Sequence, residues 1–290
     1  MVELSSPFSS MLRLSIMAKS RTGHLAALLF ALLPALGCSE ANPIPQISRA
    51  KSFVGDPGIL VVTTEPAFPP FVYLNSDNQL IGFDVDLMNE IATRLDLGVD
   101  YAYIPFDGLF ATLEAETADA SVNAMTITTE REQAIDFSRP YFQSGLAIAV
   151  RSSETRINAL EDLSGHKVAV KLGTTGANLA AQVPGAQLVT FDSAEKALID
   201  LSKGNVDAVI KDEPTTLGML EQANIGNVRL LEELLTEEYY GIGLPPDSPN
   251  KRFIDQALND IMADGTYEKL YRKWFNRTPP TLPETAPTIN

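Results

Sequence analysis

The stretch "GFDVDLMNEIATRL", residues 82–95, decides the fold of this chain. Its apolar residues recur at the three- and four-residue spacing of a helix with one buried side, which predicts a helix over 83–95. Asp86, Glu90 and Arg94 are spaced four residues apart, so they can pair on a solvated face. Asp84 lies at the expected N-terminus, where a carboxylate can cap the helix or meet its dipole. With no histidine nearby, we interpret these acids as a charged outer face and not as a metal or catalytic cluster.

Strand-like and helix-like patterns alternate on both sides of this stretch. Short apolar runs predict strands at "GILVVTT", "VDYAYIP", "ASVNAM", "KVAVKL", "QLVTF" and "VDAVIK". Helical spacing predicts helices at 109–116, 177–182, 193–204, 250–263 and 266–274. Such alternation is typical of α/β proteins with mostly parallel sheets. Two successive series predict two lobes of similar plan.

Composition limits the classes of partner. The 290 residues are enough for two domains, and 45% hydrophobic content suits a globular protein. The formal net charge of -15 argues against nucleic acid, which needs a basic face. The chain has a single cysteine, Cys38, so no disulfide can form within one chain.

The N-terminal segment has the pattern of an export signal. In "MAKSRTGHLAALLFALLPALGC", Met17–Cys38, two basic residues precede an apolar core that is short for a membrane span. The Gly37–Cys38 pair resembles a bacterial lipoprotein signal, although Ala35 stands where leucine is usual. We expect residues 1–37 to be removed and Cys38 to carry lipid; plain secretory cleavage and an uncleaved anchor are the alternatives. Met17 is also the better candidate start.

Two segments have the composition of linkers. Residues 38–56 are polar with little periodicity and predict a tether that follows the lipidated cysteine. Residues 277–290, "RTPPTLPETAPTIN", are rich in proline and threonine and predict a disordered tail.

The opening stretch also resembles the signature of bacterial extracellular solute-binding proteins, family 3, whose members bind amino acids for ABC importers. Further segments agree in order along the chain: "EPAFPPFVY", "ITTEREQAIDFSRPYFQSG", "VAVKLGTTG", "GNVDAVIKDEP", "EEYYGIGL" and "DGTYEKLYRKWF". The resemblance implies a periplasmic-binding-protein-like (type II) clamshell of two α/β lobes. Lobe 1 would be 57–140 plus 241–276, and lobe 2 with its hinges would be 141–240. The hinges would lie near 141–145 and 237–240 and allow closure.

The resemblance also implies a site for a free zwitterion, whose buried charges need partners. Arg131 would grip the ligand carboxylate with two parallel bonds, helped by Thr126, Thr174 and Thr175. Asp212 would pair with the ligand ammonium. Ala124, where the family has serine or glycine, could contribute only its backbone carbonyl.

Four further positions match those that contact the ligand side chain. Phe68 and Phe106 would sandwich it, although each alone would more often be core. Glu65 and Lys171 would reach its far end, and a charge at each suggests a polar side chain. Glu65 favours a guanidinium, ammonium or amide donor, whereas Lys171 disfavours a cation unless Glu65 neutralises it. Both together would suit a carboxamide, which donates and accepts. Glutamine and arginine are the leading cases. No metal, cofactor or catalytic residue is expected.

The resemblance implies an ABC permease as partner, a membrane anchor through Cys38, no nucleic acid, and a monomer in the periplasm or at the cell surface. Two other functions stay open. A cyclohexadienyl (arogenate/prephenate) dehydratase on the same fold would need a general acid, a role for Glu65 or Asp212. A chemosensory amino-acid receptor would use the same two lobes.

Overall fold

The computed structural model describes residues 57–287 and 289. The predicted signal segment, Cys38 and the whole of the predicted tether lie outside the described residues. Within the described part, strands and helices alternate as the sequence predicts, and the α/β fold class is confirmed.

Lobe 1 is built on a five-stranded sheet with the order β5-β1-β6-β15-β7. Its strands are β1 (Ile59–Thr64), β5 (Gly98–Tyr103), β6 (Ala120–Ser121), β7 (Asp136–Phe137) and β15 (Gly243–Leu244). β1 pairs in parallel with β5 and β6, whereas β15 runs antiparallel to β6 and β7. A small antiparallel sheet, which the sequence analysis did not predict, joins β2 (Ala67–Phe68), β3 (Val72–Leu74) and β4 (Leu80–Ile81).

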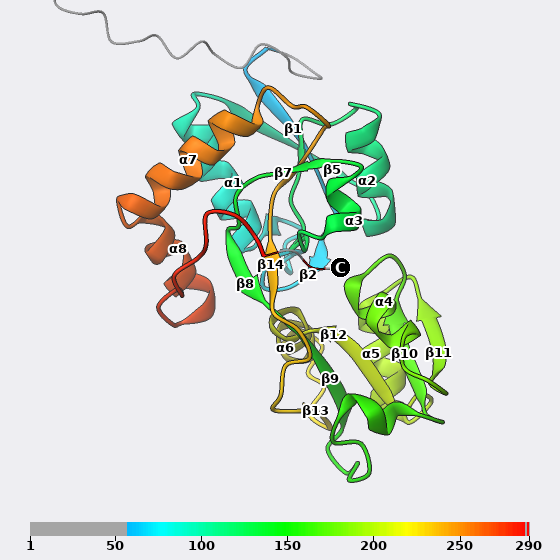
Figure 1. Ribbon diagram of the computed structural model, residues 1–290. Helices are drawn as coiled ribbons and strands as arrows, with labels where there is room; N and C mark the ends of the chain where they lie inside the picture. Colours follow the sequence, from blue (N-terminus) through cyan, green and yellow to red (C-terminus); the bar gives the residue numbers. More distant parts are fainter. Residues whose placement is uncertain (1–56, 288, 290) are drawn as a thin grey trace, which may run out of the picture. The chain divides into compact units, whose positions relative to one another are not determined.

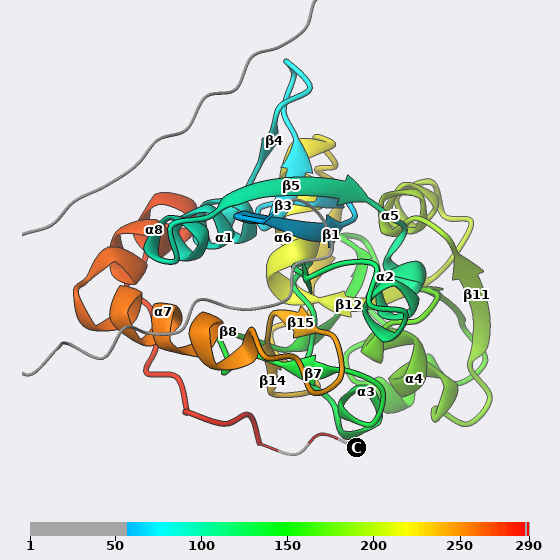
Figure 2. The ribbon, with the colours of Figure 1, turned by 90° about the horizontal axis from the view of Figure 1, so that it is seen from above.

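Helices cover this sheet with their apolar sides. Apart from the short helix α3 (Thr129–Glu132), which has no buried residue, they are α1 (Phe83–Arg94), α2 (Phe106–Glu114), α7 (Lys251–Ala263) and α8 (Thr266–Phe275). The last two helices come from the C-terminal part of the chain and pack beside α1 (Figure 2). Leu87, Met88 and Ile91 of α1 are fully buried in the core cluster of this lobe.

Lobe 2 has a second five-stranded sheet, with the order β11-β10-β12-β9-β13. Its strands are β9 (Leu146–Arg151), β10 (Lys167–Lys171), β11 (Gln187–Phe191), β12 (Ala208–Asp212) and β13 (Val228–Leu230). Its helices are α4 (Thr175–Ala181), α5 (Ala194–Lys203) and α6 (Glu213–Gln222), with a 3-10 turn at Leu160–Leu163. β10 is parallel to β11 and β12, so their carboxyl ends meet at one edge of the sheet.

Two short strands connect the lobes. β8 (Phe142–Ser144) and β14 (Glu238–Tyr240) pair antiparallel, and Figure 1 shows them side by side. Strand alternation places Glu238 and Tyr240 on one face of β14 and Tyr239 on the other. The chain therefore crosses between the sheets twice, at the positions where the sequence predicts hinges.

The α1 helix confirms most of the predicted helical face but corrects the role of Asp84. Asp86 binds the side chains of Lys273 and Trp274 on α8, and Glu90 pairs with Arg94. Asp84 is fully buried and makes no side-chain cap, so its assignment to the charged outer face is wrong. The reason lies before the helix: Gly82 has a φ of 140°, and a Cβ there would stand 1.9 Å from the Phe71 carbonyl oxygen. This close approach turns the first helical turn into the core.

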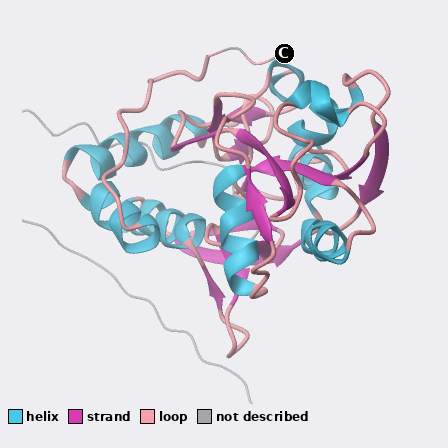
Figure 3. Ribbon diagram, turned by 90° about the horizontal axis from the view of Figure 1, so that it is seen from below, coloured by secondary structure: helices cyan, strands magenta, loops and turns pink. Residues whose placement is uncertain are grey.

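The segment after α8 contains no helix or strand in residues 277–287 (Figure 3). It nevertheless makes contacts: Leu282 and Ala286 pack against core residues, and the Ile289 carbonyl oxygen accepts from the Thr129 amide at 3.1 Å. Among residues 57–287 and 289, no helix is long and apolar enough to cross a bilayer.

Candidate ligand-binding site

Arg131 lies on the short helix α3, where the Thr128 hydroxyl caps the helix by accepting from the Arg131 amide at 3.2 Å. Its guanidinium donates to the Thr126 carbonyl oxygen at 2.7 Å and to the Gly173 carbonyl oxygen at 3.1 Å. The second bond reaches lobe 2. The guanidinium carbon also lies 5.1 Å from the Phe110 ring centre and 5.5 Å from that of Phe106. Burial lowers the pKa of Arg131, and the nearby Glu238 and Asp212 oppose that shift.

Glu238 on the hinge strand β14 joins both lobes through threonine hydroxyls. Its Oε2 accepts from Thr126 of lobe 1 at 2.7 Å and from Thr175 of lobe 2 at 3.2 Å. The side chain is buried. Burial, and next the charge of Asp212, raise the pKa of Glu238 to about 6, although the two hydroxyls favour the ionised form. The Glu238 carboxylate therefore already accepts from the two threonine hydroxyls that the family resemblance assigns to the ligand.

Asp212 ends β12 and stands at the N-cap position of α6, but its side chain makes no capping bond. Instead, its Oδ2 accepts from the Tyr240 hydroxyl at 2.6 Å, and the Ser144 hydroxyl lies 2.7 Å from that same Tyr240 oxygen. Its Oδ1 lies 3.7 Å from the Lys211 ammonium. The hinge tyrosine thus orients the acid that the sequence proposes for the ligand ammonium.

Ala124 and Thr174 differ from the predicted picture in detail. Ala124 has a φ of 47°, so the predicted strand 120–125 ends early and β6 contains only Ala120–Ser121. Its amide donates to Asp84 Oδ2 at 2.7 Å, which ties the segment to α1. The Thr174 hydroxyl caps α4, accepting from Ala177 at 3.2 Å and donating to the Lys171 carbonyl oxygen at 2.8 Å.

Glu65 and Lys171, from different lobes, form a direct ion pair. The Lys171 ammonium lies 3.0 and 2.9 Å from the two Glu65 oxygens and 2.8 Å from the Asp192 carbonyl oxygen. The Phe106 amide donates to the Glu65 carboxylate at 2.9 Å. Lys171 is buried, and Glu65 is only partly exposed.

The two predicted sandwich rings contact each other. The ring centres of Phe68 and Phe106 are 5.9 Å apart with an interplanar angle of 38°. That spacing is ordinary aromatic contact, so a ligand side chain between them requires the rings to part. The Lys211 ammonium lies 4.8 Å from the Phe68 ring centre, and that of Lys171 lies 5.5 Å from it.

We call the group Thr126, Arg131, Thr175, Asp212 and Glu238 the head end of the interlobe site, and the group Glu65, Phe68, Phe106, Lys171 and Lys211 its far end. A cavity of about 400 Å³ adjoins the head end and is lined by Arg131, Thr175 and Glu238, together with Asp107, Phe110 and Ile289 among others. A ligand in this cavity would contact the Arg131 guanidinium together with residues of both lobes.

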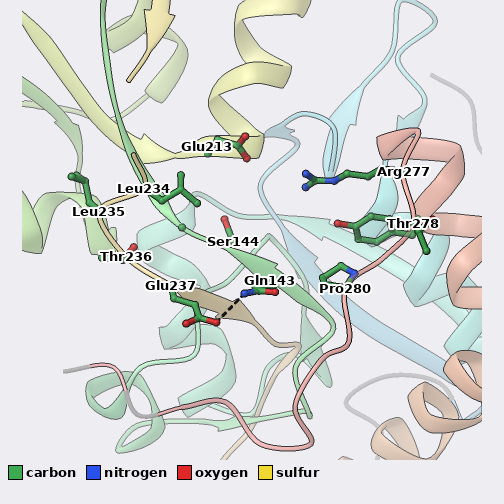
Figure 4. A pocket seen from close by; sticks show the side chains of 12 residues that line it. Gln143, Ser144, Glu213, Leu234, Leu235, Thr236, Glu237, Arg277, Thr278 and Pro280 are labelled. Carbon is green, nitrogen blue, oxygen red and sulfur yellow. Dashed lines mark hydrogen bonds between the residues drawn. The ribbon is translucent and has the colours of Figure 1, made fainter. Parts of the chain in front are cut away.

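A larger cavity, of about 780 Å³, is formed by hinge and tail residues (Figure 4). Glu213 and Arg277 project into it from different segments, and Gln143 donates to Glu237 at 2.9 Å. None of the ten predicted ligand residues lines this cavity. The smaller cavity, in contrast, is lined by Arg131 and Thr175, so we take it as the candidate site.

Sequence reasoning missed two members of the site, Glu238 and Lys211. Alternation along the predicted hinge strand would have placed Glu238 on the same face as Tyr240. Lys211 lies within a buried apolar strand, where a lysine is unusual. Burial lowers the pKa of Lys211, and Asp212 opposes that shift. In the part of the chain that the structure describes, no cluster of three or more potential ligands could hold a metal ion.

Two α/β lobes joined by two strands, with charged residues of both lobes facing a shared site, define a type II binding-protein architecture. The chain belongs to the bacterial extracellular solute-binding proteins, family 3, whose model matches residues 60–277.

The relatives support this placement. The L-cystine-binding protein TcyJ of Escherichia coli is 30% identical over 225 residues, covering 77% of this chain and 84% of that protein. An ancestral arginine-binding protein bound to glutamine is 38% identical with a TM-score of 0.73, covering 77% of this chain and 100% of that one. An ancestral amino acid-binding protein, a precursor of cyclohexadienyl dehydratase, is 33% identical with a TM-score of 0.70, covering 75% and 96%.

Proposed function

We propose that this protein binds a free polar L-amino acid between its lobes and delivers it to an ABC permease. The observation that carries the proposal is the head end: Arg131 and Thr126 from lobe 1 share a site with Thr175 and Asp212 from lobe 2. Such a site supplies a cation with donors for a carboxylate and an anion for an ammonium, as a buried zwitterion requires. The named ligands of the relatives, cystine, arginine and glutamine, are of this class.

The roles proposed for the ten predicted residues follow from this arrangement. Arg131, Thr126 and Thr175 would hold the carboxylate; Asp212 and the Ala124 carbonyl would hold the ammonium; Thr174 supports the turn before α4. Phe68, Phe106, Glu65 and Lys171 would contact the side chain. Glutamine and arginine are the leading ligands, since the far end offers both a carboxylate and an ammonium.

A thermal-shift screen of the purified protein against the common free amino acids tests the proposal. A ligand that binds only the native state raises the melting temperature, by an amount that grows with its concentration. We expect one polar amino acid, or a small chemical group of them, to raise it. If none does, and calorimetry detects no binding either, the proposal is wrong.

Transport requires partners and a location outside the cytoplasmic membrane. We propose docking on an ABC permease, because ligand binding shifts a two-lobed protein toward its closed form, and anchoring through lipid on Cys38. Deletion of the gene should abolish uptake of the ligand. Uptake that survives deletion, with loss of a chemotactic response, would favour the receptor function. Labelling cells with a fatty-acid analogue should tag the wild-type protein and not the Cys38→Ala variant.

A second candidate is a cyclohexadienyl dehydratase activity, which two observations favour. One relative is described as a precursor of that enzyme. Glu238 is also a buried acid whose pKa of about 6 would suit proton donation. Incubation of the protein with prephenate and arogenate distinguishes the two functions. Release of product would establish the enzyme activity, and unchanged substrate would exclude it and leave amino-acid binding as the proposed function.

A further inference from the structure

The far end of the interlobe site already contains a cation bound to its only acid. The Lys171 ammonium, from the end of β10 in lobe 2, contacts both oxygens of Glu65 in lobe 1 at 2.9 and 3.0 Å. The Asp192 carbonyl oxygen, at 2.8 Å, holds the ammonium from the other side. Lys171 is buried, so these partners replace the water that a lysine ammonium would otherwise contact.

This arrangement decides what Glu65 can offer a ligand. A guanidinium grips a carboxylate through two parallel bonds and therefore needs both of its oxygens. In Glu65 both oxygens accept from Lys171, and one also accepts from the Phe106 amide. An arginine or lysine side chain would have to displace Lys171, which would leave that ammonium buried without its partner.

A second buried ammonium, that of Lys211, would also repel a cationic ligand side chain. Lys211 lies 4.8 Å from the Phe68 ring centre and 3.7 Å from Asp212 Oδ1. The interlobe site as a whole then pairs three cations (Arg131, Lys171, Lys211) with three acids (Glu65, Asp212, Glu238). A zwitterion with a neutral side chain keeps this balance, whereas a cationic side chain adds a positive charge that has no partner.

We propose that Lys171 is the specificity-determining residue of the site: its ammonium occupies Glu65 and makes the protein select a neutral polar amino acid over a cationic one. This inference depends on the proposed function, because it concerns the same amino-acid site. A carboxamide side chain fits best, since its oxygen can accept from Lys171 while its amide donates to Glu65. Of the two leading ligands, the structure therefore favours glutamine over arginine.

Calorimetry with glutamine, arginine and lysine on the wild type and on Lys171→Met tests this inference. The wild type should bind glutamine at least about tenfold more tightly than arginine. In Lys171→Met, Glu65 no longer binds an ammonium of the protein, and the ratio of arginine to glutamine affinity should rise at least about tenfold. Lys203→Met, on the exposed side of α5, is the matched control and should leave the ratio unchanged.

A second variant covers the case in which Lys171→Met does not fold. Glu65→Gln leaves Lys171 without its acid, so arginine affinity should fall further relative to glutamine. The inference is wrong if the wild type binds arginine as tightly as glutamine, or if neither variant moves the ratio by more than about threefold. A wild type that binds no amino acid at all would overturn the proposed function together with this inference, and the two failures are thereby distinguished.

Discussion

The two ends of the interlobe site hold their charges in different ways. At the head end, Arg131 donates to backbone carbonyl oxygens, and the acids Glu238 and Asp212 accept from hydroxyls of threonine and tyrosine. At the far end, Glu65 and Lys171 bind each other directly. Both ends are largely buried, so the difference is one of partners and not of exposure.

That difference determines what a ligand must displace. The head-end ions Arg131 and Glu238 are hydrogen-bonded to neutral groups, and Asp212 accepts from the Tyr240 hydroxyl besides lying 3.7 Å from the Lys211 ammonium. A ligand carboxylate or ammonium can replace bonds to neutral groups with stronger charge-assisted ones. A cationic ligand at the far end must first separate a buried ion pair, which costs about 3–5 kcal/mol when one partner is left alone. We infer that the head end recognises the part common to all amino acids and that the far end selects among side chains.

The largest expected effect is that of removing the head-end cation. Arg131→Ala should raise the dissociation constant of every amino acid that binds about a thousandfold, or about 4 kcal/mol, because the ligand carboxylate is left buried without a cation. Calorimetry on the variant and on Arg252→Ala, an exposed arginine of α7 in the same lobe, measures it. Near-native binding by Arg131→Ala would end the assignment of the head end to the ligand carboxylate.

Asp212→Asn tests the anionic half of the head end. Asparagine can still accept from the Tyr240 hydroxyl, so the fold should persist, but the partner charge of the ligand ammonium is lost. We expect about a hundredfold loss of affinity, or about 3 kcal/mol, for all ligands alike. A loss confined to one ligand would show that Asp212 belongs to the selective far end instead.

The buried acid Asp84, which accepts from the Ala124 amide, makes stability depend on pH. Burial raises the pKa of this acid to about 7, although the Ala124 amide favours the ionised form. Because the folded state holds this proton more tightly than the unfolded chain, stability should rise as the pH falls from about 8 to about 5, on the order of 2 kcal/mol.

Asp84→Asn removes that titration. The difference in unfolding free energy between the wild type and the variant should therefore change over that pH range, as measured by urea unfolding at several pH values. A constant difference would show that Asp84 keeps its ionisation state on folding. Asp86→Asn is the control on the same helix, where the acid is partly exposed and bonded to Lys273 and Trp274.

The smallest expected effect concerns Glu238, the internal carboxylate of the head end. Above its pKa of about 6, the Glu238 carboxylate is negatively charged. It then repels both Asp212 and a ligand carboxylate, whereas Arg131 attracts Glu238. Wild-type affinity should therefore increase a few-fold as the pH falls from about 8 to about 6, and Glu238→Gln should flatten this dependence, an effect of about 1 kcal/mol. Equal pH profiles for the two proteins would place the ligand carboxylate away from Glu238.

The secondary structure followed from local patterns in the sequence. The helical period of residues 83–95 predicts α1, and the apolar runs predict β1, β5, β10, β11 and β12. Shorter strands were harder to predict from the sequence. β6 stops at Ser121, ahead of the positive φ of Ala124, and β2, β3 and β4 depend on pairing with one another. Such pairings are set by contacts between strands, which periodicity does not reveal.

By itself, the sequence determined the alternation of strands and helices and the resemblance to the solute-binding family. The hinge positions and the residues of a zwitterion site stay predictions from that resemblance. Burial and partners depended on the tertiary structure. Asp84 and Asp86 lie two residues apart on one helix, yet one is fully buried and the other bonds to α8 near the surface. Glu65 and Lys171 are distant in sequence, and only the approach of the two lobes makes them a pair. Electrostatic interactions depend on distances through space, so no local pattern could have identified that pair.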